Sequence, residues 1–467
     1  MMKTAEIKTR SRELFKISMP MVVEHLAIAA MGMISTMLVA SIGEHATSAL
    51  GMVDSVSNLI IALFAALTTG GTIVVAQFIG KQDILSAKRA AGQAIVLTVI
   101  FSAVILAILL MFRVQVLNLL FGEAEADVMA AALTFLFIVS FSFPILAVTQ
   151  TIFGILRGAG DTLTPMVISI IMNAANLGLG LVLINGLDLG VFAIPAFGVT
   201  GAAMGLVIAR LLGLAGAVFF IVKKARGVRL NRLRFFKPDV PIQKTILNLG
   251  MPTSFESALF HVGRLMTQVF IVSISTAAIA TNTIAGSIAN FVNVPGMALA
   301  TGVMILVGQR IGRGDVEDVK KTVLFATATA SVMFAVLCII MFFVRNPIFA
   351  LFNPSDEALS YLPMVFITYL VATPLFWAVS FVIPAALRAT GDVVYPMVVS
   401  ISTMLIVRVA SSYVFAIVLN MGIMGIWLAM YLDWVARSAF FVPRLLSGKW
   451  KGKGIKAPEP ETEIKGE

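Results

Sequence analysis

Long apolar stretches separated by short polar segments run through the whole chain. A membrane-spanning helix needs about 20 mostly apolar residues, and twelve stretches reach that length. They cover residues 17–40, 47–78, 91–112, 128–153, 164–186, 198–222, 246–273, 280–309, 322–344, 358–386, 394–419 and 422–446. The longest polar segment between two of them, 223–245, is too short for a soluble domain. The pattern therefore predicts an all-α polytopic membrane protein with 12 transmembrane helices.

Composition excludes a soluble protein. Of the 467 residues, 59% are hydrophobic and 12% are charged, whereas soluble chains have about 45–50% apolar and about 25% charged residues. The single cysteine, Cys338, excludes a disulfide within the chain, an iron–sulfur cluster and a cysteine-based zinc site. Three histidines leave little for another metal centre. We expect no cofactor other than a coupling ion.

The distribution of positive charge predicts an orientation in the membrane. Lysine and arginine gather in alternate loops, including 81–89, 223–244 and 310–321, whereas the opposite loops hold only Arg113 and Arg345. Cytoplasmic loops carry the excess of basic residues, so both termini are expected in the cytoplasm of a cell-membrane protein. The net charge of +10 is then expected to face anionic lipid rather than nucleic acid. The tail 448–467, rich in Lys, Pro and Glu, is expected to be disordered.

The chain contains an internal repeat. The motif MPMVVEHL recurs 232 residues later as MPTSFESA, which pairs Glu24 with Glu256. VVAQFIGKQD recurs as ILVGQRIGRGD, and LRGAGDT recurs as LRATGD, which pairs Arg157 with Arg388. Each copy holds six predicted helices, so the copies are parallel repeats related by an axis along the membrane normal.

The repeat predicts a two-lobed transporter. The expected divisions are an N-lobe at 1–228 (helices 1–6), a C-lobe at 229–447 (helices 7–12) and the tail at 448–467. Secondary transporters bind substrate and ions near such a repeat interface and alternate access by rocking one half against the other. No GxxxxGK[ST] loop for an ATP-driven pump occurs, and no polar stripe indicates a channel. The chain is therefore not expected to be an enzyme.

In their order and duplication, these motifs resemble the multidrug and toxic compound extrusion (MATE) family from about residue 14 to 447. The resemblance implies an exporter of small, amphipathic cationic drugs or dyes, driven by inward flow of H⁺ or Na⁺. Arg408 in IVRVASSY resembles the family's helix-11 arginine. Acids found at four family positions are absent here, where Ser35, Gly180, Phe260 and Trp377 stand instead.

Six polar residues in the spans are candidates for cation coupling. A carboxylate in an apolar span costs about 2.5–3.5 kcal/mol, so it usually has a partner or a task. Glu24 and Glu256 are therefore the leading candidates, the competing hypothesis being a helix-packing role beside the prolines. The others are Asp54, Asn58, Asn176 and Asn290; the three amides equally suit a Na⁺ shell or interhelical hydrogen bonds.

Aromatic residues indicate where substrate binds. All five Tyr and all four Trp follow residue 360, and aromatic faces can stack on a flat cation. Tyr369 and Trp377 lie deep in one predicted span, and we add Phe260 and Met266 as candidates for the substrate wall. The competing hypothesis for all four is ordinary packing.

Four arginines lie inside predicted spans. The spacing of Asp433 and Arg437 predicts an ion pair within one helix. Arg264 is expected to neutralise an acid, and Arg210 and Arg408 to bond carbonyls or acids of neighbouring helices. The same arginines keep open an alternative function, a flippase for a lipid-linked precursor, which needs a cationic cavity for a diphosphate. A monomer in contact with membrane lipids is expected in either case.

Overall fold

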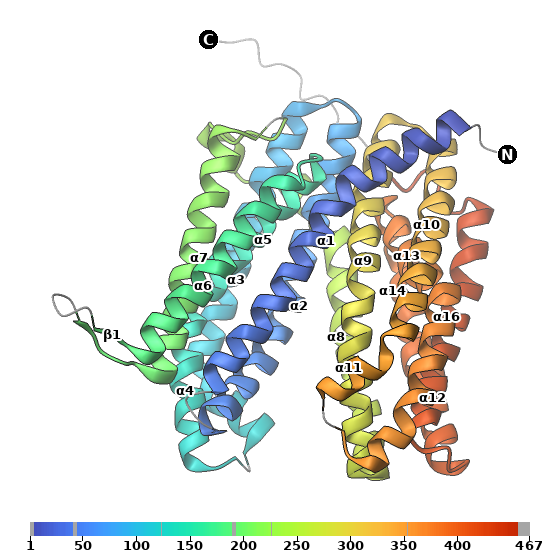
Figure 1. Ribbon diagram of the computed structural model, residues 1–467. Coiled ribbons are helices and arrows are strands. Elements are labelled where there is room, and N and C mark those ends of the chain that lie inside the picture. The colour runs from blue at the N-terminus through green and yellow to red at the C-terminus, as the bar shows by residue number, and fades with distance from the viewer. Residues whose placement is uncertain are drawn as a thin grey trace, which may run out of the picture. The chain divides into compact units, whose positions relative to one another are not determined.

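The computed structural model describes residues 4–40, 44–122, 124–188, 193–225, 227–352 and 354–455, and Figure 1 labels its elements. The fold is helical apart from one antiparallel hairpin, formed by β1 (Leu187–Asp188) and β2 (Ala193–Ile194). The α-helices are α1 (Thr4–Ala40), α2 (Glu44–Gly80), α3 (Ile84–Phe121), α4 (Ala126–Ser140), α5 (Ser142–Gly158), α6 (Leu163–Asn185), α7 (Gly198–Lys223), α8 (Val240–Ile274), α9 (Thr276–Arg313), α10 (Val316–Phe343), α11 (Arg345–Leu351), α12 (Asp356–Ala372), α13 (Ala378–Ala389), α14 (Val394–Ser402), α15 (Ala410–Tyr413) and α16 (Gly422–Ser447). A 3₁₀ helix, η1 (Leu233–Phe236), precedes α8, and three π-helical segments, η2 (Thr373–Trp377), η3 (Thr403–Val409) and η4 (Val414–Val418), join α12 to α13, α14 to α15 and α15 to α16.

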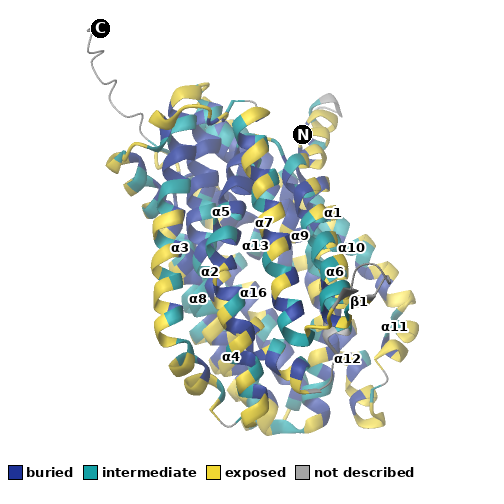
Figure 2. Ribbon diagram, turned by 90° about the vertical axis from the view of Figure 1, so that its left-hand side faces the viewer, coloured by how far each residue is buried: buried dark blue, intermediate teal, exposed yellow. Residues whose placement is uncertain are grey.

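The lengths of the helices suit a polytopic membrane protein. Within the described residues, ten helices are long and apolar enough to cross a membrane, and the bent pair α4–α5 makes eleven. The twelfth predicted span corresponds to α16, which has 26 residues but carries Asp433 and Arg437 in its interior. Its membrane crossing remains a prediction. Many outward faces are apolar, as the exposed Leu119 and Leu351 illustrate, and Figure 2 shows exposed and buried residues on opposite faces of the helices.

Contacts divide the chain into two compact units. The N-terminal unit comprises Val23–Ser254, and the C-terminal unit comprises Met1–Val22 together with Phe255–Glu467. The two boundaries lie inside α1 and α8, whereas the predicted lobe boundary lies in the loop at 228/229. The difference arises because each of these long helices packs its first part with one unit and its remainder with the other.

Within the N-terminal unit, the first part of α8 lies in close contact with α2. A Cβ atom added at Gly70 would lie 2.3 Å from the Ile246 carbonyl oxygen, so only glycine permits this approach. The segment before α8 is held by Gln93, whose Nε2 donates to the carbonyl oxygens of Phe235 at 3.2 Å and Lys237 at 2.7 Å. The polar linker of the sequence is therefore a packed part of this unit.

Within the C-terminal unit, the first part of α1 is held by polar contacts. Arg10 donates to Thr322 Oγ1 at 2.8 Å and pairs with Asp318. Arg310 pairs with the same carboxylate and, at 2.7 Å, with Glu13. One half-buried carboxylate on α10, that of Asp318, thus binds both α1 and α9.

The repeat reappears in the backbone where α5 and α13 end. Gly160 and Gly391, matched by the repeat, have φ angles of +94° and +92°, values that favour glycine. A Cβ at Gly391 would also lie 2.0 Å from the Lys453 carbonyl oxygen. The tail therefore packs here: Trp450 is fully buried, and Lys453 pairs with Asp392 at 2.7 Å. The segment expected to be disordered from residue 448 is packed as far as 455, and 456–467 lie outside the described residues.

Candidate functional site

Glu24, the first predicted coupling residue, lies in a buried ion pair of the N-terminal unit. Its side chain is 3% exposed. Arg157, in the last turn of α5, donates from Nη2 to both carboxylate oxygens at 2.7 Å. Pro20, one turn earlier in α1, precedes the boundary between the units.

Glu256 makes the same pair in the C-terminal unit. Arg388, in the last turn of α13, donates from Nη2 to its carboxylate oxygens at 2.6 and 2.8 Å. In both pairs one nitrogen contacts both oxygens, and the Nε atoms of Arg157 and Arg388 have no hydrogen-bond partner in the described structure. The sequence paired each acid with its repeat mate, but it did not predict the two arginine partners.

The other four predicted coupling residues do not gather around these acids. Asp54 and Asn58 are exposed one turn apart on α2, and Asp54 is attracted by Arg210 of α7. Asn176 is half-buried on α6, and Asn290 is exposed on α9 in the other unit. Among the described residues, no three His, Cys, Asp or Glu side chains come together as a metal site.

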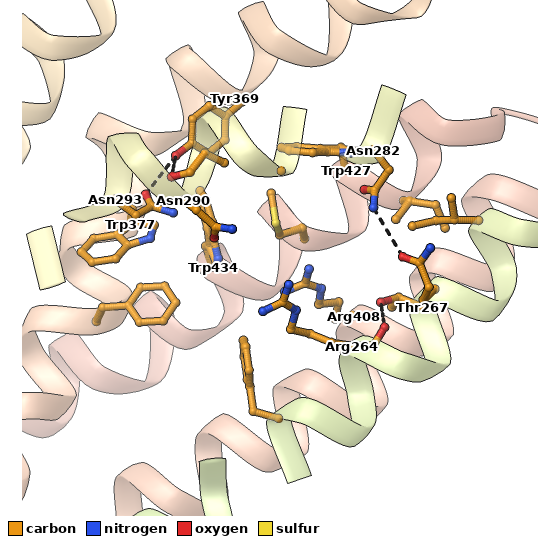
Figure 3. Close-up of a pocket in the computed structure, with 18 of the residues that line it drawn as sticks. Arg264, Thr267, Asn282, Asn290, Asn293, Tyr369, Trp377, Arg408, Trp427 and Trp434 are labelled. Atoms are coloured by element: carbon orange, nitrogen blue, oxygen red, sulfur yellow. Dashed lines mark hydrogen bonds between the residues drawn. The ribbon is translucent and has the colours of Figure 1, made fainter. Parts of the chain in front are cut away.

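A cavity with a volume of about 380 Å³ lies within the C-terminal unit. Helices α8, α9 and α16 and the spans containing η2 and η3 supply its wall (Figure 3). The lining residues are Phe260, Arg264, Thr267, Gln268, Ile271, Asn282, Gly286, Ala289, Asn290, Asn293, Met297, Tyr369, Trp377, Phe381, Arg408, Ile426, Trp427, Met430 and Trp434.

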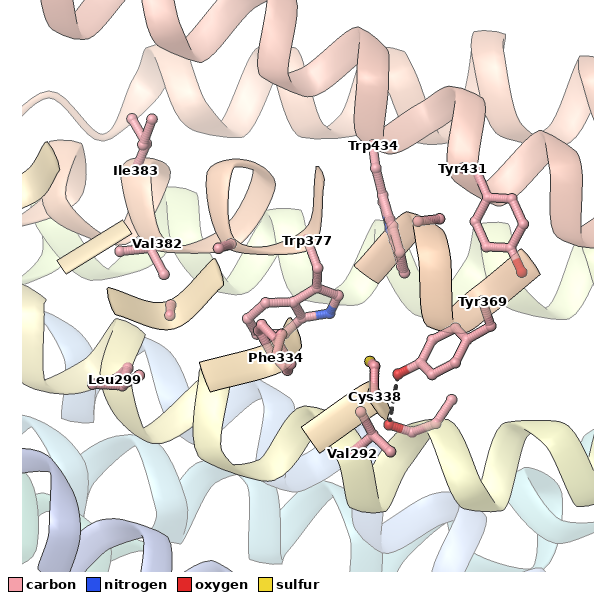
Figure 4. Packing of buried hydrophobic residues seen from close by; sticks show 14 of the residues in the cluster. Val292, Leu299, Phe334, Cys338, Tyr369, Trp377, Val382, Ile383, Tyr431 and Trp434 are labelled. Atoms are coloured by element: carbon pink, nitrogen blue, oxygen red, sulfur yellow. Dashed lines mark hydrogen bonds between the residues drawn. The ribbon is translucent and has the colours of Figure 1, made fainter. Parts of the chain in front are cut away.

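Three of the four predicted substrate residues lie on this wall, and Met266 does not. Tyr369 donates its hydroxyl hydrogen to Asn293 Oδ1 at 2.9 Å. Trp377 stacks on Phe381 with ring centroids 4.5 Å apart. Figure 4 shows Tyr369 and Trp377 among the side chains of the buried apolar cluster, to which both belong. Met266 is 44% exposed on α8 and is not part of the lining. Phe260, Tyr369 and Trp377 remain substrate candidates, because packing in the wall is compatible with contact to a ligand.

The cavity wall carries positive charge without a carboxylate. Arg264 and Arg408 line it, and Figure 3 shows both side chains ending in the middle of the lining residues. Asp433 lies nearby, but its Oδ1 accepts a hydrogen bond from Arg437 Nε at 2.9 Å, as the sequence predicted. Arg408 is attracted by Asp433 and repelled by Arg437 and Arg264.

Two expectations for these arginines are corrected. Arg264 was expected to neutralise an acid, but its side chain has no ion pair in the described chain. Arg408 was expected to bond carbonyls or acids, but its buried Nε has no partner there. Arg210 bonds a neighbouring helix as expected, but its partner is a hydroxyl group, Ser142 Oγ of α5, rather than a carbonyl or an acid. Helical spacing predicts an ion pair within α16, whereas it says nothing about partners on other helices.

Two π-helical segments position cavity residues. Trp377 is the last residue of η2, and Arg408 lies in η3. π-Helical turns inside α-helices are frequent at functional sites. The sequence offered no sign of these segments, and it also did not indicate the amides of Gln268, Asn282 and Asn293. The crowding of Trp and Tyr after residue 360 was the one signal that could have included Trp427 and Trp434 in the wall.

Comparison with known proteins supports this architecture. The family model MatE matches residues 20–182 and 252–414, once in each half of the chain. The probable multidrug resistance protein NorM of Thermotoga maritima is 27% identical over 464 residues, which covers 98% of this chain and 97% of the relative. The uncharacterized transporter YisQ of Bacillus subtilis is 26% identical over 442 residues, with 95% of each chain covered. A multidrug resistance MATE family transporter of the MOP superfamily, solved in an outward-facing conformation, has a TM-score of 0.86 at 22% identity, with 94% of this chain and 96% of that chain covered. The predicted repeat and the all-helical polytopic fold are thereby confirmed.

Proposed function

The chain belongs to the MatE family of multi-pass membrane transporters, and from this premise we propose that it is a secondary active multidrug exporter. Inward flow of H⁺ or Na⁺ drives an amphipathic drug outward by alternating access. The names of its relatives, which include a probable multidrug resistance protein, support this function. We further propose that both termini are cytoplasmic and that the protein works as a monomer.

The observation that carries the proposed coupling is the pair of matched ion pairs. In α1 the N-terminal unit begins at Val23, and Glu24 is the next residue. In α8 the second part of the C-terminal unit begins at Phe255, and Glu256 is the next residue. Each carboxylate therefore holds its helix just after the helix passes from one unit to the other. A change in this contact acts directly on the segment that joins the units.

Coupling then consists of competition for the carboxylates. A proton that neutralises Glu24 or Glu256, or a Na⁺ that replaces the guanidinium group, breaks the pair with Arg157 or Arg388. The freed helix can change its packing, and the unit-to-unit rearrangement follows. One charge moving down about 100 mV supplies about 2.3 kcal/mol, which supports roughly a 50-fold gradient of a neutral substrate.

The test is transport by purified protein in proteoliposomes, with Na⁺ and pH gradients imposed separately. Amphipathic fluorescent dyes of both charge signs are followed, and Glu24→Gln, Glu256→Gln and the double variant are compared with the original protein. We expect at least about a tenfold loss of gradient-driven export in the double variant, with dye binding retained. Glu317→Gln is the matched control, because Glu317 is exposed and its pair with Lys451 lies at the surface.

Two results decide against the proposal. If the double variant exports dye at the original rate under the gradient that drives the original protein, the coupling role of the two glutamates is refuted. If neither gradient drives any dye in the original protein, the exporter function itself is refuted.

The flippase alternative has one observation in its favour, the unpaired arginines of the cavity. Of the four arginines that suggested it, Arg437 is committed to Asp433 and Arg210 to Ser142. The cavity volume of about 380 Å³ lies at the low end of the range for drug-sized ligands, about 300–1,000 Å³. A lipid-linked oligosaccharide diphosphate would need far more space, so the cavity favours the exporter of small molecules.

A further inference from the structure

We propose that the cavity of the C-terminal unit binds small aromatic anions, namely flat ring systems that carry a carboxylate or a sulfonate, in preference to cations. This inference names the substrate class of the exporter proposed above and rests on that function for its transport role. It departs from the cationic drugs that the family resemblance implies. Three features of the cavity wall support it, namely its positive charge, the occurrence of that charge in one half of the repeat, and its aromatic side chains.

The wall itself carries no negative charge. Arg264 and Arg408 line the cavity, and the described lining contains no Asp or Glu. The nearby Asp433 attracts Arg408, but its Oδ1 is hydrogen-bonded to Arg437. Arg264 is exposed and Arg408 is half-buried, so the cost of removing a polar group from water without a partner falls on the buried Nε of Arg408. An anionic ligand supplies the missing partner and gains charge-assisted hydrogen bonds from the guanidinium groups.

Arg408 in particular offers a free donor. Its Nε is buried and has no hydrogen-bond partner in the described structure. Asp433 attracts this arginine, whereas Arg437 and Arg264 repel it. A guanidinium group suits the planar, two-oxygen geometry of a carboxylate, so a ligand anion can satisfy the donor and reduce the repulsion at the same time.

The architecture of the repeat does not require these arginines. With the offsets of the internal repeat, 232 for Arg264 and 231 for Arg408, the matching residues of the N-terminal half are Gly32 and Leu177. Both are uncharged. The Glu–Arg pairs, by contrast, occur in both halves. The two cavity arginines are thus a feature of one half, as expected for residues that recognise a ligand rather than maintain the fold.

The remaining wall suits an aromatic body. Trp377, Trp427 and Trp434 line the cavity together with Tyr369 and Phe381. Aromatic faces and edges pack against a flat ring, and amides such as Asn290 offer further hydrogen bonds. An aromatic wall also attracts cations, but here two positive charges oppose a cation, and the one nearby carboxylate, Asp433, is shared between Arg408 and Arg437.

Three probes that share one ring system test the preference. They are 2-naphthoate, 2-naphthamide and 2-naphthylmethylammonium, which are anionic, neutral and cationic. Their binding is measured by isothermal titration calorimetry on the full-length protein in nanodiscs of zwitterionic lipid, with empty nanodiscs as the blank. We expect the naphthoate to bind at least about tenfold more tightly than the amide, and the ammonium compound to bind most weakly.

Substitutions identify the residues responsible. Arg264→Gln and Arg408→Gln are each expected to weaken naphthoate binding by about tenfold or more while changing amide binding by no more than about twofold. Arg264→Lys keeps the charge and is expected to keep the ranking of the probes. Arg345→Gln is the matched control, because Arg345 lies in the same unit but outside the cavity and donates to the Phe342 carbonyl oxygen.

The outcomes are distinguishable from those of the proposed function. Equal binding of the three probes, tightest binding of the ammonium compound, or an unchanged ranking in both glutamine variants overturns this inference. If the arginine-dependent preference for naphthoate is found but no ion gradient drives any dye or probe across proteoliposomes, the exporter function fails and the inference about the cavity stands. If an ion gradient drives export of cationic dyes and the ammonium probe binds more tightly than naphthoate, the exporter function stands and the inference about the cavity fails.

Discussion

The Asp433–Arg437 pair of α16 gives the most direct test of the electrostatics of the C-terminal unit. The two side chains are 1% and 3% exposed, and Arg437 Nε lies 2.9 Å from Asp433 Oδ1. Arg437 also donates to the Ser400 carbonyl oxygen at 3.3 Å and lies over the ring of Phe260. The change Asp433→Asn removes the negative charge with little change in volume and leaves Arg437 buried without a counter-charge.

The size of the effect follows from burial. Removing one partner of a buried ion pair costs about 3–5 kcal/mol, because the other charge stays desolvated. Here the upper part of that range is expected, since Asp433 also attracts Arg408. Arg437→Met is expected to be similarly costly. In the double variant neither charge remains, and replacement of a buried pair by uncharged residues is often neutral, so the double variant is expected to be more stable than either single variant.

The chain provides its own probe for the measurement. Cys338 on α10 is the single cysteine, and it is 4% exposed in the same unit. When labelling requires unfolding, the labelling rate follows the population of the open state, and about 1.4 kcal/mol corresponds to a factor of ten. Asp433→Asn is therefore expected to label roughly 1,000-fold to several thousand-fold faster. Glu317→Gln is the control. A rate for Asp433→Asn within about threefold of the original would refute the reasoning.

Two further substitutions test the packing of the units. Gly70→Ala places a Cβ atom 2.3 Å from the Ile246 carbonyl oxygen and is expected to destabilise the N-terminal unit by about 1–3 kcal/mol. The free energy of unfolding is measured in mixed detergent–SDS micelles. Gly51→Ala is the control, because no atom lies within 4 Å of its new Cβ, and it should not destabilise the unit. Trp450→Ala removes a fully buried side chain and is expected to cost about 3–5 kcal/mol in the Cys338 labelling assay, whereas Lys449→Ala, at the exposed position beside it, should change stability by less than about 0.5 kcal/mol. An equal effect of the two substitutions would contradict the packing assigned to Trp450.

The sequence predicted the helices and the repeat because lipid imposes a strict rule on spans. A helix that faces hydrocarbon must be apolar for about 20 residues, and that requirement is visible in any window of the chain. The sequence did not predict where the units divide. The composition of α1 does not change at Val22. The division there depends on contacts of the first part of α1 with α9 and α10. These contacts are made by side chains such as Arg10 and Glu13, whose partners lie far away in the sequence.

The sequence predicted the acids of the candidate site but not their partners. Residue type identified Glu24 and Glu256, because a carboxylate in an apolar span is unusual. Their partners Arg157 and Arg388 lie 133 and 132 residues away, and no periodicity connects residues on different helices. The same limit explains why Arg264 was expected to have an acidic partner and Arg408 a carbonyl or acidic one. Helical spacing predicted the Asp433–Arg437 pair, but only the fold shows that Asp433 also attracts Arg408.

The difference between the halves separates two kinds of polar residue. The Glu–Arg pairs occur in both repeats with the same one-nitrogen contact, as expected if they serve the proposed movement that the two halves share. Arg264, Arg408 and the tryptophans of the wall occur in one half only. Under the proposed function, these one-sided residues are expected to hold a ligand in the cavity of the C-terminal unit rather than to take part in a movement shared by both halves.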